Sequence, residues 1–151
     1  MFRNYLDKIE RDEDVRKNLI ELRKLLKIEP GSAAWQRDRQ RCLSLMLKLL
    51  KHEDAKVRKN AALILGEMGC QDALDALFYA YECEEKLFVK SAYLTAMSQL
   101  DYRTYLNAFR ERMEELMQME MTPENQKHLK KIIPFWQQKN QSVTRKIWLF
   151  Q

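Results

Sequence analysis

Two histidines and three cysteines are the side chains in this sequence that could bind a metal or act as a nucleophile. Zinc sites need such ligands at short, repeated spacings. His52 and His128 have no second histidine or cysteine at ligand spacing, and Cys42, Cys70 and Cys83 lie far apart. We therefore predict no metal site and no cofactor. We interpret both histidines as solvated surface residues and the cysteines as small buried apolar residues.

Two clusters of carboxylates are the other groups that could carry acid–base chemistry. One is the Asp-Glu-Asp run at residues 12–14, and the other comprises Glu82, Glu84 and Glu85. Both clusters fall at expected helix starts or turns, where carboxylates offset the helix dipole. The sequence has no glycine-rich phosphate loop, no nucleophile elbow and no metal-binding helix motif. We therefore predict no catalytic residues.

The composition favours a single all-helical domain. The chain has 151 residues, the size of one domain, and its hydrophobic content of 46% is enough for a packed core. Only 3 glycines and 3 prolines occur, whereas an all-β fold needs many turns made from these residues. No stretch is apolar enough to span a membrane, and the start has no signal-peptide pattern. The odd number of widely spaced cysteines indicates reduced thiols in a cytoplasmic protein.

Apolar residues recur every three or four positions along most of the chain, as in amphipathic helices. A Pro-Gly pair at residues 30–31 ends the first long stretch, and Ser32 and Asp54 are placed to cap the helices that follow them. Pro134 falls inside the last pattern, and we expect it to kink or end that helix. From residue 140 onward no helical period is present.

A motif at residues 54–69 repeats in weaker form 32 residues further along the chain. It consists of an acidic turn, Val-Arg, a run of small residues and Leu-Gly-x-apolar-Gly. In the second copy Val89-Lys90 takes the place of Val57-Arg58, and the tetrapeptide Val-Arg-Lys-Asn occurs both at residues 15–18 and at residues 57–60. The motif resembles the HEAT repeat, in its bacterial phycobilisome-lyase-like form.

This resemblance implies an all-α fold, a short right-handed α–α superhelix (a HEAT-like solenoid) of about three to four helix pairs. A single pair cannot bury its apolar faces alone, and stacking makes the core continuous. We expect the HEAT-like domain at residues 1–139, with N-terminal capping helices at 1–31 and helix pairs at 32–69, 70–101 and 102–139. Residues 140–151 would form a C-terminal tail that folds back over the last pair or, as we prefer, leads into a downstream domain.

The resemblance also assigns structural roles within the repeat. The residues concerned are Asp54, Val57, Arg58, Gly66 and Gly69. In the family, the turn acid and the arginine of Val-Arg form hydrogen bonds along the stack. The second copy carries Lys86 and Lys90 at these two positions, so we expect the ladder to be broken there.

Basic side chains are the candidates for partner binding. The net charge of +5 is unevenly distributed, with +1 over residues 1–29, +4 over 30–69, −5 over 70–121 and +5 over 122–151. This distribution permits nucleic-acid binding without requiring it. In the family, the second helix of each unit usually lines the concave surface. The candidate partner-binding residues on that basis are Lys59, Leu63, Lys90, Lys127, Lys130 and Lys131.

We therefore expect a non-catalytic scaffold that binds another macromolecule, with a protein as the first candidate partner. The alternative is an RNA- or DNA-binding N-terminal module of a larger bacterial nucleic-acid-modifying enzyme, such as an RNA methyltransferase, because this type of repeat occurs fused to such enzymes. A third hypothesis is an independent enzyme, either a DNA-repair glycosylase or a bilin lyase. It is disfavoured because Trp35, Trp136 and Trp148 show no arrangement typical of a catalytic cleft.

Overall fold

The computed structural model of the chain describes residues 1–29 and 31–137, so the expected tail at 140–151 lies outside the described residues. All regular structure in the described residues is helical, and short turns or connections join its eight α-helices. The bounds are α1 Phe2–Glu10, α2 Val15–Ile28, α3 Ala33–Leu49, α4 Ala55–Glu67, α5 Leu74–Cys83, α6 Leu87–Ser98, α7 Leu106–Gln118 and α8 Pro123–Gln137. The prediction of an all-α solenoid of helix pairs is confirmed.

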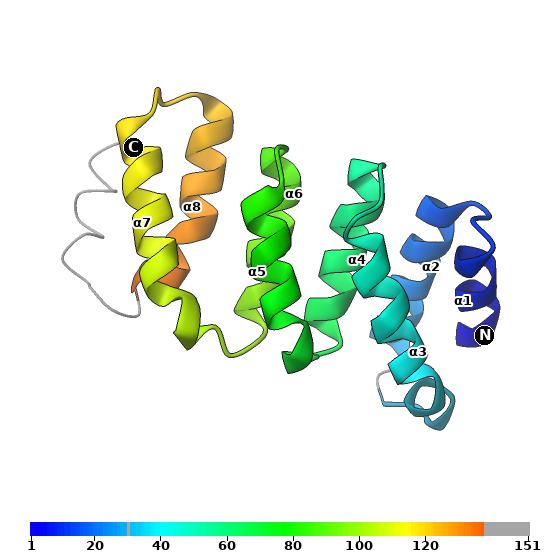
Figure 1. The fold of residues 1–151 in the computed structure, drawn as a ribbon. Helices are drawn as coiled ribbons and strands as arrows, with labels where there is room; N and C mark the ends of the chain where they lie inside the picture. The colour runs from blue at the N-terminus through cyan, green and yellow to red at the C-terminus, as the bar shows by residue number, and fades with distance from the viewer. Residues whose placement is uncertain (30, 138–151) are drawn as a thin grey trace.

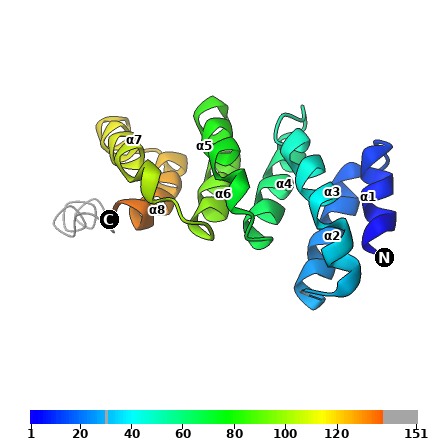
Figure 2. The same ribbon diagram turned by 60° about the horizontal axis from the view of Figure 1, so that its bottom comes forward.

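The helices stack side by side in four units, α1/α2, α3/α4, α5/α6 and α7/α8 (Figure 1), with α1 at one end and the fourth unit at the other. The two helices of each unit contact each other. The second helices also contact one another in the order α2, α4, α6 and α8, so we call them the second-helix row. Figure 2 shows the same succession of units from a second direction. Each unit therefore buries its apolar faces against its neighbours.

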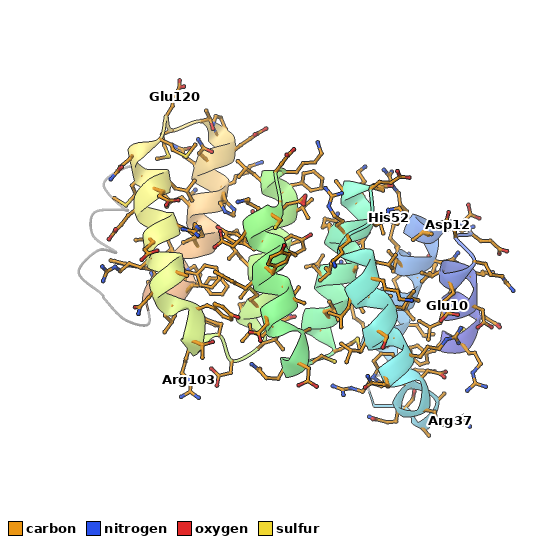
Figure 3. The ribbon with its side chains drawn as sticks, in the orientation of Figure 1. Glu10, Asp12, Arg37, His52, Arg103 and Glu120 are labelled. Atoms are coloured by element: carbon orange, nitrogen blue, oxygen red, sulfur yellow. The ribbon has the colours of Figure 1, made fainter. Side chains whose placement is uncertain are left out.

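The turns within units and the connections between units lie along opposite edges of the stack (Figure 3). Asp12, His52 and Glu120, which lie in the turns of the first, second and fourth units, follow the upper edge in this view. Arg103, in the connection between the third and fourth units, lies along the lower edge, as does Arg37 near the start of α3. The second-helix row is therefore bordered by within-unit turns on one side only.

Backbone contact between α4 and α6 holds the second and third units together. A Cβ atom added at Gly66 on α4 would lie 2.5 Å from the Cα atom of Ala96 on α6 and 2.9 Å from its Cβ atom. No other residue type leaves room for this approach. Gly69 follows α4 with φ of +65°, the left-handed conformation that commonly ends a helix. Val57, in the first turn of the same helix, is fully buried.

Two ion pairs connect the starts of α2 and α4 to the within-unit turn of the next unit. Arg16 of the first unit donates to Asp54 of the second, and this guanidinium lowers the pKa of the Asp54 carboxyl to about 2. Arg58 of the second unit donates to Glu84 of the third, with Nη2–Oε1 and Nε–Oε2 distances of 2.7 Å and 3.0 Å. Lys90, the next residue in this series, makes no ion pair within the described residues. The ladder therefore has two rungs.

The first helices are also connected by arginine side chains. Arg41 on α3 donates to Asp7 and Glu10 on α1, with Nη2–Oδ1 and Nε–Oε1 distances of 2.6 Å and 2.8 Å. Arg112 on α7 donates through two nitrogens to Glu82 on α5, at 2.8–3.0 Å. Both arginines thus pair with carboxylates of a neighbouring unit, and their charge is used within the stack.

Pro134 does not end the last helix, because α8 continues to Gln137. A proline removes its own N–H, which would have bonded the carbonyl of Lys130 one turn earlier, and its ring crowds that carbonyl. Both Pro134 and Lys130 lie on the exposed face of α8, where solvent can satisfy that carbonyl. Phe135 and Trp136 are buried, and their packing holds the final turn in place.

Candidate functional site

Residues that could bind metal or react do not gather in one place. Within residues 1–29 and 31–137, no group of three histidine, cysteine or acidic side chains is positioned to hold a metal ion. No helix of that part is long and apolar enough to cross a membrane. Cys42 and Cys70 are buried, and burial raises the pKa of Cys42 to about 12, which keeps it a thiol. Cys83 is exposed, so its interpretation as a buried residue is wrong.

His128 is a buried structural residue, so its interpretation as a solvated histidine is wrong. Its side chain on α8 is only 2% exposed and lies between α5 and α6. The Nε2 atom is 2.9 Å from the hydroxyl of Tyr81, and the Nδ1 atom is 3.3 Å from the hydroxyl of Ser91. A neutral imidazole has one donor and one acceptor, so this site satisfies both ring nitrogens.

Burial lowers the pKa of His128 to about 4, with a further contribution from the nearby Lys90 ammonium. The folded chain keeps this histidine neutral, whereas the unfolded chain protonates it near pH 6.5. Stability is therefore lost as the pH falls from about 6.5 towards 4. Between pH 7 and pH 5 we expect the wild type to lose about 2 kcal/mol more unfolding free energy than His128→Gln, measured by urea denaturation.

Gln126→Ala is the control for this pH dependence, because Gln126 is exposed on the same helix and does not titrate. Its unfolding free energy should follow the wild-type curve between pH 7 and pH 5. If His128→Gln also followed that curve, the histidine would not be buried in the neutral form.

A groove of about 930 Å³ lies on the solvent side of the second-helix row, between α6 and α8. We call it the α6–α8 groove. Leu87 and Phe88 at the start of α6 provide its apolar surface, and Phe88 remains 48% exposed. Its other lining residues are Glu85, Lys86, Ser91, Glu124, Lys127, Lys130 and Lys131. The groove therefore combines an exposed aromatic ring with four lysines.

The four groove lysines differ from most arginines of the chain in having no ion pair within the described residues. Lys127, Lys130 and Lys131 are exposed on α8, and Lys86 is exposed in the turn before α6. The sequence from residue 138 to 151 contains no acidic side chain. These ammonium groups are therefore free to pair with an anionic partner, at little desolvation cost.

Positive charge is concentrated on the second-helix row. The net charges of α2, α4, α6 and α8 are +4, +2, +1 and +2, whereas those of α1, α3, α5 and α7 are 0, +3, −2 and −1. In the third and fourth units the first helices are acidic and the second helices are basic. Near the groove, the folded stack therefore has an acidic face formed by α5 and α7 and a basic face formed by α6 and α8.

The candidate partner-binding residues fall into three places. Lys127, Lys130 and Lys131 line the α6–α8 groove. The Lys90 Nζ atom lies 4.7 Å from the ring centroid of Tyr81, a cation–π contact that gives it a structural role. The two remaining candidates, Lys59 and Leu63, are partly buried on α4 and do not line the groove.

Sequence reasoning did not identify Lys86 or Phe88 as binding residues. The sequence pattern marks Lys86 as a departure from the repeat and does not distinguish Phe88 from the other apolar residues of a helix. The sequence carries no signal for the exposure of Phe88, because consecutive apolar residues of the same helix, such as Tyr93 and Leu94, are both buried. The side-by-side placement of α6 and α8 was needed to connect them with the lysines of α8.

Comparison with known proteins gives one match. The family model described as HEAT repeats matches residues 4–98 and, in a second overlapping placement, residues 43–116. No curated protein and no solved structure matches the chain. The first match alone spans more than half of the sequence.

Proposed function

From the premise that this chain belongs to the HEAT-repeat family, we propose that it is a non-catalytic scaffold that binds a protein partner through its second-helix row. HEAT repeats form helical scaffolds for interactions, and the free cysteines are compatible with the reducing cytoplasm. We place the contact surface at the α6–α8 groove, with Lys59 and Leu63 of α4 extending it along the row.

The observation that carries this proposal is the exposed Phe88 ring in a groove lined by four lysines that have no ion pair among the described residues. An aromatic side chain half open to solvent loses part of the stabilisation that its burial would provide. Exposed apolar surface with a polar rim is typical of protein-binding sites. A purely solubilising surface would need the lysines but not the ring.

Reversing three charges in the groove should abolish recovery of the partner. We expect the tagged variant Lys127→Glu/Lys130→Glu/Lys131→Glu to lose the proteins that the wild type enriches from extracts of its own cells, measured by quantitative mass spectrometry. Like charges across an interface slow association and disfavour the complex.

The matched control is Arg37→Glu/Lys48→Glu/Lys51→Glu, which reverses three exposed charges at α3 and the turn after it. It has the same net charge as the groove variant and should enrich the same proteins as the wild type. Equal losses in both variants would assign the effect to net charge and contradict a localised binding surface.

A second candidate function, binding of RNA or DNA, is favoured by the positive charge of all four helices in the second-helix row. Such binding depends on phosphate contacts, so its affinity would fall steeply as the salt concentration rises. Titration of labelled RNA and duplex DNA at low salt tests it. Undetectable binding under those conditions would eliminate this candidate and with it a role as the nucleic-acid module of a modifying enzyme.

A further inference from the structure

We propose that the α6–α8 groove binds a short acidic peptide segment that carries an aromatic or large aliphatic side chain. This inference rests on the proposed function and adds the chemical class of the bound segment. Two properties of the groove define that class, namely its charge and its apolar surface.

The charge of the groove requires an anionic occupant. Lys86 reaches it from the turn before α6, while Lys127, Lys130 and Lys131 reach it from three positions of α8. The carboxylates of Glu85 and Glu124 also line it, leaving a net charge of +2. Aspartate and glutamate side chains of an incoming segment can pair with the lysines, and unpaired lysines would otherwise repel one another.

The apolar surface requires the occupant to contribute an apolar side chain. Phe88 and Leu87 lie at the start of α6 and line the groove beside the lysines. An aromatic or large aliphatic side chain placed against Phe88 would cover surface that water now contacts. An apolar contact with a polar rim around it is the usual arrangement of a protein interface.

A peptide fits this groove better than a nucleic acid. Its volume of about 930 Å³ is in the range of sites that bind small ligands, so it can hold a few side chains of a bound segment. Single-stranded nucleic acids are bound by several aromatic platforms in succession, whereas Phe88 is the one aromatic residue among the described residues that line this groove. Among the described residues, the lining includes no arginine for bidentate phosphate contacts.

The test is fluorescence anisotropy with the purified chain and a labelled decapeptide of aspartate and glutamate with central phenylalanine and leucine residues. We expect saturable binding that weakens about tenfold in Lys127→Glu/Lys130→Glu, equivalent to about 1.4 kcal/mol. We expect a weakening of about fivefold in Phe88→Ser, whose side chain is exposed enough to be replaced without loss of the core. Lys48→Glu/Lys51→Glu is the control and should bind as the wild type does.

Two further probes decide between the chemical classes. A peptide with serine in place of phenylalanine and leucine should bind more weakly, and equal binding would overturn the apolar part of the proposal. A single-stranded poly-dT probe that bound as tightly as the acidic peptide would overturn the proposal in favour of nucleic acid. If no peptide bound while the groove charge reversal still abolished partner recovery, this inference would fail and the proposed function would stand.

Discussion

Arg58→Ala is expected to lower the unfolding free energy by about 3 kcal/mol, measured by urea denaturation. The Glu84 side chain that Arg58 contacts is only 6% exposed, and Arg58 itself is 16% exposed. Removing the guanidinium leaves this carboxylate buried without its partner. It also removes the donor to the backbone carbonyls of His52 and Glu53, at 2.8 Å and 3.0 Å. For a chain of this size, the melting temperature should fall by about 6–12 °C.

Arg103→Ala is the matched control, because Arg103 also pairs with a carboxylate, Asp101, through two nitrogens. This pair lies within one turn, and its side chains are 79% and 50% exposed. Exposed pairs contribute about 1 kcal/mol or less, so the control should unfold nearly as the wild type does. Equal stabilities of the two variants would show that the Arg58–Glu84 pair does not hold the second and third units together.

Gly66→Val is expected to destabilise the chain by about 3 kcal/mol or to prevent folding. The new Cβ atom would overlap the Cα atom of Ala96, which is backbone and cannot rotate away. Helices α4 and α6 would have to separate, and the contact between the second and third units would loosen. The small gain from replacing glycine inside a helix does not offset this loss. Thermal unfolding followed by circular dichroism measures the effect.

Ser44→Val controls for the presence of valine in a helix, because Ser44 is exposed on α3. Its effect should stay within about 0.5 kcal/mol. A Gly66→Val protein as stable as the wild type would contradict the close approach of α4 and α6.

The fold could be predicted from the sequence mainly because one repeat keeps its motif. The small residues and the two glycines at residues 54–69 specify a helix that another backbone contacts closely. Helix α1 was not predicted individually, although Phe2, Leu6 and Ile9 recur at helical spacing and are buried. The apolar pattern of α1 covers 9 residues, whereas the helix that follows it, α2, has 14. The shorter pattern is therefore the weaker helix signal.

The partners of the repeat residues could not be predicted, because they depend on how units stack. Glu84 was interpreted as a carboxylate that offsets a helix dipole, yet it is the ladder partner of Arg58. His128 shares its face with Ile132 and Phe135 at spacings of four and seven, which was the available signal for burial. The imidazole can be buried because the hydroxyls of Tyr81 and Ser91 bind it, and these residues lie on other helices, so the sequence around His128 does not reveal them.

The groove could be predicted only in part for the same reason. The three lysines of α8 share one exposed face, and the sequence indicated them as binding candidates. Phe88 is about forty residues earlier in the chain, and only the contact between α6 and α8 brings it beside them. Stacking also separates basic second helices from acidic first helices in the third and fourth units, which no single stretch of sequence reveals.

Site-specific photo-crosslinking in living cells tests most directly whether partners bind the second-helix row. A photoreactive amino acid would replace Lys130 or Lys59 on that row, and Ser44 or Glu114 on the first helices in matched variants. All four proteins should fold, and the second-helix positions alone should give a discrete crosslinked product, with Lys130 giving the stronger one. Adducts formed only from Ser44 or Glu114 would place the binding surface on the opposite row and contradict the account.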